Sequence, residues 1–178
     1  MLEIELKVKV TSLGPVRRRL LEQSAVFLDK VKEHDIYYNA PHRDFAKTDE
    51  ALRIRYKNSN KRDVVFTYKG PKQPNLELKA REELNIPINS GDVFELILQR
   101  LGFRSVAEVD KLRENYRYQD AMVSLDSVEN LGTFVEIELS SDNEMENAIE
   151  RINWIAKELG IKEEPILASY LELLLAKQ

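Results

Sequence analysis

The sequence contains no cysteine and only two histidines, His34 and His42, among its 178 residues. Without thiols the chain can form no disulfide, no cysteine-ligated metal centre and no thiolate nucleophile. Two histidines cannot build a three-histidine metal site, so a bound metal ion would depend mainly on carboxylates. Long hydrophobic runs are also missing, since purely apolar stretches last a few residues and a membrane-spanning helix needs about 20.

An excess of basic charge is absent as well. The chain has 31 acidic and 27 basic side chains and a formal charge of −4, which does not favour binding along nucleic acid or an anionic membrane. Met1 leads into alternating apolar and charged residues rather than a targeting signal, so we expect a cytoplasmic protein. Hydrophobic residues make up 43% of the chain, and its length predicts a single domain over residues 1–178.

Alternation of apolar and polar residues is the dominant local pattern. In residues 2–10 every second side chain is apolar, and those between are acidic or basic. A period of two is typical of strands with one buried and one polar face. We expect such strands at residues 2–10, 52–57, 63–69, 76–86, 110–118, 122–128 and 133–140, with a short extended piece at 35–38 as an eighth.

Helical spacing of apolar residues punctuates these strands. The clearest helix is predicted over residues 142–159, where Ile149, Ile152 and Leu159 recur at helical intervals and Gly160 ends the pattern. Asp92 and Glu95 resemble a capping box at the start of a second helix. Helices are therefore expected at 13–23, 92–101, 142–159 and 167–176.

The polar faces of the predicted strands carry charged residues in strand after strand. On one half-buried strand, a charged face would simply meet water. If the strands closed into a barrel, with helices covering the apolar faces outside, the charged faces would line its interior. We therefore expect an α+β fold, an eight-stranded antiparallel closed β-barrel with flanking helices.

The basic residues on these inner faces would converge on an anion. Arginine offers planar forks that match phosphate oxygens and lysine offers point charges, and six cations suit three linked phosphates better than one. The acidic residues would repel such an anion unless Mg²⁺ or Mn²⁺ lay between them. The cations are Lys7, Arg53, Arg55, Lys69, Lys111 and Arg113, and the carboxylates are Glu3, Glu5, Asp126, Glu136 and Glu138.

An ordered set of short motifs carries a family resemblance. ExExK, formed by Glu3, Glu5 and Lys7, is followed by EALRIR at 50–55, TYKG at 67–70, REE at 81–83, KLR at 111–113, LDSV at 125–128 and LGTFVEIE at 131–138. Together they resemble the CYTH superfamily, the triphosphate tunnel metalloenzymes, along nearly the whole chain. DIYYN at 35–39 and SYLELL at 169–174 are most similar to the class IV adenylyl cyclase branch.

The resemblance implies a barrel whose tunnel binds a triphosphate together with Mg²⁺ or Mn²⁺. It implies catalytic roles for Glu3, Glu5, Lys7, Asp126 and Glu136. By the same resemblance, the metal ligands are Glu3, Glu5, Asp126, Glu136 and Glu138, and the triphosphate-binding residues are Lys7, Arg53, Arg55, Lys69, Arg81, Lys111 and Arg113. For Arg81, a plain ion pair with Glu83 along the strand accounts for the pattern about as well.

Three functions are compatible with these residues. The cyclase-like ends favour an adenylyl cyclase that converts ATP to cyclic AMP and pyrophosphate. The same tunnel would serve a hydrolase of inorganic triphosphate, thiamine triphosphate or a nucleoside triphosphate. A non-catalytic sensor fits less well, because binding alone would not require so many carboxylates. We expect a small-molecule triphosphate as partner, with no nucleic acid and no membrane, and the cyclase branch suggests a homodimer.

Overall fold

Eight antiparallel strands close into a barrel in the computed structural model, which describes residues 2–58, 60–141 and 145–177. Around the barrel the strands follow the order β1-β5-β4-β3-β2-β6-β7-β8. They are β1 (Leu2–Val10), β2 (Val26–Asn39), β3 (Ala51–Lys57), β4 (Asn60–Lys69), β5 (Lys79–Ile88), β6 (Arg104–Tyr118), β7 (Ala121–Val128) and β8 (Gly132–Ser141). The predicted α+β fold with a closed eight-stranded barrel is confirmed.

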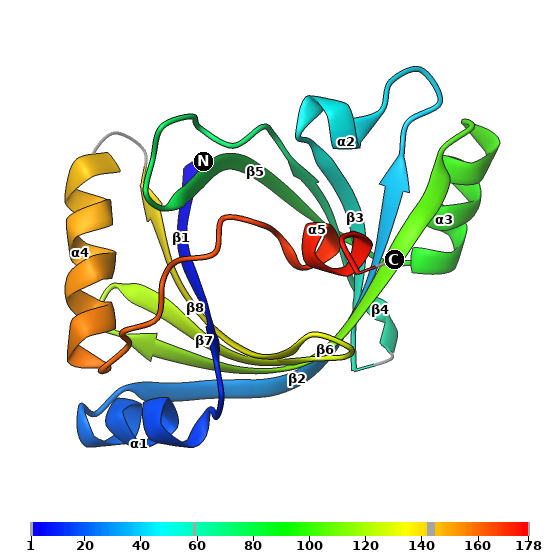
Figure 1. Ribbon diagram of the computed structural model, residues 1–178. Coiled ribbons are helices and arrows are strands. Elements are labelled where there is room, and N and C mark those ends of the chain that lie inside the picture. The colour runs from blue at the N-terminus through cyan, green and yellow to red at the C-terminus, as the bar shows by residue number, and fades with distance from the viewer. Residues whose placement is uncertain (1, 59, 142–144, 178) are drawn as a thin grey trace.

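Helices cover much of the outside of the barrel (Figure 1). Outward-facing Ile4, Val123 and Ile137 are fully buried in one apolar cluster with Leu20 and Ile152 from two of these helices. The described helices are α1 (Gly14–Glu22), α2 (Phe45–Thr48), α3 (Gly91–Arg100), α4 (Met145–Glu158) and α5 (Tyr170–Leu175). None of them is both long and apolar enough to span a bilayer.

A second apolar cluster joins α3 to the outer faces of β2, β3 and β4. Ile54 and Leu98 are buried in it. The predicted capping box at the start of α3 is wrong, because the carboxylate of Glu95 accepts hydrogen bonds from the hydroxyls of Tyr38 and Tyr56 instead. These bonds fasten α3 to the barrel wall.

Several boundaries differ from the predicted ones. β2 runs over fourteen residues rather than four, because polar side chains occupy both of its faces and hide the alternation. His34 lies within β2. β5 begins at Lys79 rather than residue 76, and the short helix α2 was not predicted. The start of the helix predicted over 142–159 falls at 142–144, outside the described residues.

The segment that follows α4 crosses the mouth of the barrel and ends in α5 (Figure 1). The backbone N–H of Ile166 donates to the carbonyl of Lys7 at 2.7 Å. Tyr170 packs edge to face on Phe134, with 5.0 Å between the ring centroids. The carboxyl-terminal segment therefore forms part of the wall around the barrel interior.

Candidate active site

Charged side chains fill the interior of the barrel, as the alternation predicts. They line a narrow cavity of about 100 Å³. Strand register places opposite charges side by side, as in the pairs Lys7 with Glu136 and Arg55 with Asp35. The lining comprises the predicted Glu3, Glu5, Lys7, Arg53, Arg55, Lys69, Arg81, Lys111, Arg113, Glu136 and Glu138, together with Tyr37, Ala51, Lys79, Glu83, Ser169 and Tyr170. We call this cavity the tunnel.

Three of the predicted metal ligands meet in the tunnel. Carboxylate oxygens of Glu3, Glu5 and Glu138 all lie within 4.8 Å of one another. Burial, together with the neighbouring Glu3 and Glu136, raises the pKa of Glu138 to about 8. The pKa of Glu3 is raised as well, mainly by burial. Because the cations nearby do not fully compensate Glu3 and Glu138, the trio fits a hard divalent cation.

The other two predicted ligands, Asp126 and Glu136, hold an arginine. Arg113 donates from Nε and Nη2 to the two oxygens of Asp126 at 2.7 and 2.5 Å. The same Nη2 contacts Glu136. Burial opposes the charge on Glu136, but Arg113 and Lys7 outweigh it and keep its pKa well below the usual value. These two carboxylates thus differ from the trio because both contact the buried Arg113. Their role as metal ligands stays a prediction.

Two carboxylates that the sequence did not single out lie among the predicted phosphate-binding cations. Asp35 accepts a two-pronged hydrogen bond from Arg55 at 2.6 and 2.7 Å. Glu33 lies 3.0 Å from Arg55 and 3.2 Å from Lys111. β2 therefore brings carboxylates of its own into the tunnel, beside the cations predicted to bind phosphate.

Lys79 is a further tunnel cation missed from the sequence, although it belongs to the charged face predicted for residues 76–86. Its Nζ lies 2.5 Å from Glu5, which also pairs with Lys7 at 2.8 Å. Burial lowers the pKa of Lys79 to about 8, although Glu5 opposes that change. Lys7 and Lys79 in turn bring the pKa of Glu5 to about 2 against the effect of burial. Both lysines thus keep the carboxylate of Glu5, one member of the acidic trio, ionised.

Arg81 and Arg53 are less well satisfied than the other tunnel cations. Arg81 is only 3% exposed, and its Nε has no hydrogen-bond partner. Nε of Arg53 is likewise buried without a partner, although this guanidinium also donates to Thr67 at 3.1 Å. The alternative prediction of an Arg81–Glu83 ion pair is wrong, because Glu83 pairs with Lys69. A buried guanidinium with an N–H that lacks an acceptor is a strong candidate for binding an anion.

Tyr170 of α5 closes one side of the tunnel, and no periodic signal in the sequence could have identified it. Its hydroxyl donates to Asp126 at 2.8 Å. The Nζ atoms of Lys7 and Lys111 lie 4.6 and 5.1 Å from the centre of its ring. The carboxyl-terminal segment thereby touches both the acidic and the basic side chains of the site.

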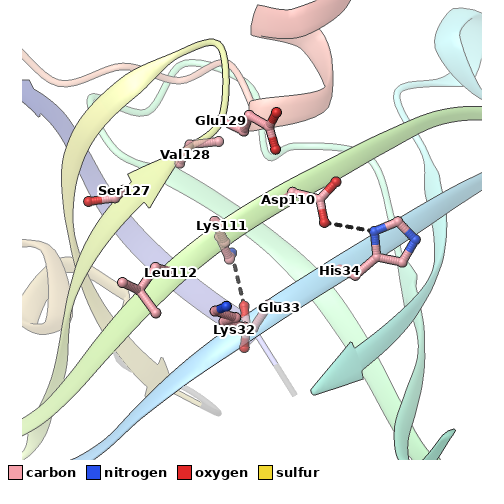
Figure 2. A pocket seen from close by; sticks show the side chains of 9 residues that line it. All are labelled: Lys32, Glu33, His34, Asp110, Lys111, Leu112, Ser127, Val128 and Glu129. Atoms are coloured by element: carbon pink, nitrogen blue, oxygen red, sulfur yellow. Dashed lines mark hydrogen bonds and ion pairs between the residues drawn. The ribbon is translucent and has the colours of Figure 1, made fainter. Parts of the chain in front are cut away.

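A larger hollow of about 440 Å³ lies over β2, β6 and β7 (Figure 2). Its charged groups are mostly paired with each other, as in the contacts of His34 with Asp110 at 2.8 Å and of Lys111 with Glu33 at 3.2 Å. Leu112, Ser127 and Val128 complete much of its wall. Of the two lysines in this hollow only Lys111 is buried, whereas the tunnel brings several buried cations together, so the tunnel is the better candidate site.

Relatives of the chain are found over almost its whole length. The model of the CYTH domain family matches residues 1–170. A Methanocaldococcus jannaschii protein named "putative adenylate cyclase" is 40% identical over 176 residues, which are 97% of this chain and 98% of that protein. The adenylate cyclase CyaB of Aeromonas hydrophila is 25% identical over 143 residues, 80% of this chain and 71% of that protein. The solved structure of a Pyrococcus horikoshii protein matches with a TM-score of 0.88 and 41% identity over 99% of both chains.

Proposed function

Because the chain belongs to the CYTH family, we propose that it is a divalent-metal-dependent, adenylyl cyclase-like enzyme that converts ATP to cyclic AMP and pyrophosphate. The observation that carries the proposal is the tunnel, in which buried lysines and arginines face a cluster of three carboxylates. Such a site suits a triphosphate that arrives with metal ions. The name of the Methanocaldococcus jannaschii relative supports the choice of a cyclase.

The donor set of the acidic trio fits Mg²⁺ or Mn²⁺, which Glu3, Glu5 and Glu138 would hold. When bound, such an ion favours ionisation of an attacking hydroxyl and offsets negative charge on the phosphates. Asp126 and Glu136 are proposed to contribute through Arg113, whose guanidinium both contact, or as further ligands.

In the proposed reaction the ribose 3′-oxygen forms a bond to the α-phosphorus. The bond from that phosphorus to the oxygen shared with the β-phosphate breaks, and pyrophosphate leaves while the hydroxyl proton passes to solvent. The chain contributes position and charge, the main means of catalysis in phosphoryl transfer. Lys7, Lys69 and Arg113 exchange part of their carboxylate contacts for phosphate oxygens, and Arg81 gains the acceptor that its Nε lacks.

A substrate panel tests the proposal. Purified protein is incubated with ATP, tripolyphosphate or thiamine triphosphate and either Mg²⁺ or Mn²⁺, from neutral to strongly alkaline pH. Cyclic AMP, pyrophosphate and phosphate are assayed separately. We expect cyclic AMP and pyrophosphate in equal amounts from ATP. Release of phosphate alone from any of the three compounds would replace the cyclase by a triphosphate hydrolase.

Glu138→Gln tests the metal site in the same assay. The change removes a charge that the metal ion would share, so we expect turnover to fall about 100-fold or more, since even outer partners of metal ligands are worth about 10–100-fold. Glu22→Gln on the exposed end of α1 is the matched control and should turn over normally. Normal turnover by Glu138→Gln would remove this residue from the site.

A further inference from the structure

A further cavity, of about 300 Å³, is lined by residues of β2, α2, β3, β6 and α5; α5 lies at the barrel mouth (Figure 1). Tyr37, Ala51, Arg81 and Ser169 line both this cavity and the tunnel, so the two adjoin. Building on the proposed function, we propose that this mouth cavity binds the nucleoside part of a nucleoside triphosphate whose phosphates lie in the tunnel.

The wall of the mouth cavity is largely apolar. Phe45, Leu52 and Leu171 contribute to it from α2, β3 and α5. Val106 and Leu175 lie at the same cavity and remain 47% and 40% exposed. A concave apolar surface of this size is typical of sites that bury a small organic group. A flat base would cover apolar surface that protein side chains leave open to water.

The carboxylates in this wall already have partners. Glu50 accepts from Tyr68 at 2.6 Å and pairs with Arg43 at 2.9 Å. Lys72 pairs with Asp49 at 2.5 Å and with Glu172 at 2.9 Å. Acidic groups of this kind keep phosphates out of the mouth cavity. Because each of these carboxylates is already engaged in an ion pair, none is left unpartnered for a cationic group such as the thiazolium of thiamine, and an uncharged base fits best.

The junction of the two cavities orients the substrate. Arg81 lies there with its buried, unpartnered Nε, so the phosphate nearest the nucleoside would meet this guanidinium. On β6, Val106 lines the mouth cavity and Lys111 lines the tunnel. The substrate therefore lies along the strand, with the base at the mouth and the terminal phosphate toward Lys111 and Arg113.

The same wall predicts weak discrimination between bases. The Asn39 side-chain oxygen accepts from the backbone of Ala40 and Phe45, and its nitrogen donates to Asp44. The Tyr38 hydroxyl donates to Glu95. Because the hydrogen-bonding groups of Asn39 and the Tyr38 hydroxyl are engaged within the protein, the cavity recognises a base by shape and apolar surface rather than by its hydrogen-bonding edge.

Two substitutions in the wall test the proposal. Ala46→Trp fills the cavity from an exposed position on α2, and Leu175→Asp makes its wall polar. Ala176→Trp, exposed but outside the cavity, is the matched control. Calorimetry with Mg²⁺ measures the Kd of tripolyphosphate and of α,β-methylene ATP and GTP, which cannot release pyrophosphate.

We expect Ala46→Trp to raise the Kd of both nucleotide analogues at least tenfold and Leu175→Asp to raise it at least threefold. The Kd of tripolyphosphate should change less than twofold in both variants. The control should have the Kd values of the unchanged protein. The unchanged protein should bind the ATP and GTP analogues within about fivefold of each other.

Equal losses for nucleotides and tripolyphosphate, or no loss in either variant, would overturn the mouth cavity as the nucleoside site. A preference of more than fiftyfold between the two analogues would overturn recognition by shape. Failure of the unchanged protein to bind tripolyphosphate and both nucleotides is a distinct result, because it would remove the proposed function and with it this inference.

Discussion

The carboxylate of Glu33 lies where three buried cations meet. Its Oε2 is 3.0 Å from Arg55, 3.2 Å from Lys111 and 4.0 Å from Arg113. Burial opposes ionisation of this carboxyl, but Lys111, Arg55 and Arg113 outweigh it and lower the pKa of Glu33 to about 2. Glu33 therefore stays charged at neutral pH and holds three proposed phosphate-binding residues in position.

Glu33→Gln should change how stability depends on pH. A carboxyl whose pKa is lower in the folded than in the unfolded chain stabilises the fold above about pH 4.5, and that contribution is lost as the pH falls toward 2. We expect the substitution to reduce the free energy of unfolding by about 3 kcal/mol at pH 7, as for other broken buried ion pairs. The difference from the unchanged protein should shrink below pH 4.5.

Urea unfolding at pH 7, 5 and 3 measures this difference, and Glu22→Gln serves as an exposed control. Other carboxylates titrate in both proteins, so the difference between the two curves isolates Glu33. A difference that stays constant down to pH 3 would mean that Glu33 is not held ionised by its neighbours.

The difference in polarity between the two faces of a strand decides whether the sequence predicts that a charged side chain points into the barrel. Glu5 and Glu136 alternate with residues that are fully apolar, so period two places them inside the barrel. Glu33 has the polar neighbours Lys32 and His34, so the same rule gives no direction there. The partners of each charge could not be predicted either, because they depend on strand register across residues far apart in the chain.

The helix α5 is stabilised mainly by contacts at its amino-terminal end. With six residues it is too short to be stable alone. Its capping box is complete, since Ser169 Oγ accepts from the backbone of Glu172 at 3.2 Å and Glu172 accepts from the backbone of Ser169 at 2.7 Å. Lys72 adds an ion pair to Glu172 at 2.9 Å. These contacts keep Tyr170 against the tunnel.

Ser169→Ala should loosen α5 without unfolding the barrel. Loss of a serine cap costs about 1 kcal/mol, so amide hydrogens of residues 170–176 should exchange about fivefold faster. Hydrogen exchange measured by mass spectrometry reports this segment separately from the strands. Ser127→Ala, at an exposed serine on β7, is the matched control. Unchanged exchange in α5, or faster exchange spread over the whole barrel, would contradict the local role of the cap.

Length and periodicity explain which elements the sequence could predict. β1 and the carboxyl-terminal end of α4 were predicted close to their observed bounds, whereas α2, with four residues, is too short for a periodic signal. The expectation that helices cover the apolar outer faces holds for β1 and β8 but not for all of β5. Leu84 and Ile86 remain 52% and 56% exposed there, which sequence alternation alone cannot distinguish from burial under a helix.

At the scale of the whole molecule, the cationic and acidic side chains inside the tunnel are equal in number. Their formal charges therefore cancel, although the net charge of the chain is −4. A triphosphate alone would add uncompensated negative charge to a buried site, whereas a triphosphate carrying divalent cations would add much less. The cations inside the barrel are Lys7, Arg53, Arg55, Lys69, Lys79, Arg81, Lys111 and Arg113, and the carboxylates are Glu3, Glu5, Glu33, Asp35, Glu83, Asp126, Glu136 and Glu138.

This balance predicts that metal and triphosphate bind together. Tripolyphosphate with Mg²⁺ should raise the melting temperature by about 5–10 °C at 100 times its Kd, which corresponds to about 2.7 kcal/mol. With a chelator in place of Mg²⁺ the rise should nearly vanish. By linkage, triphosphate must tighten metal binding by the same factor, and Glu138→Gln should weaken this coupling because it removes one carboxylate of the trio. Equal stabilisation with and without metal would show that the tunnel's own cations suffice, and the acidic trio would then need a different role.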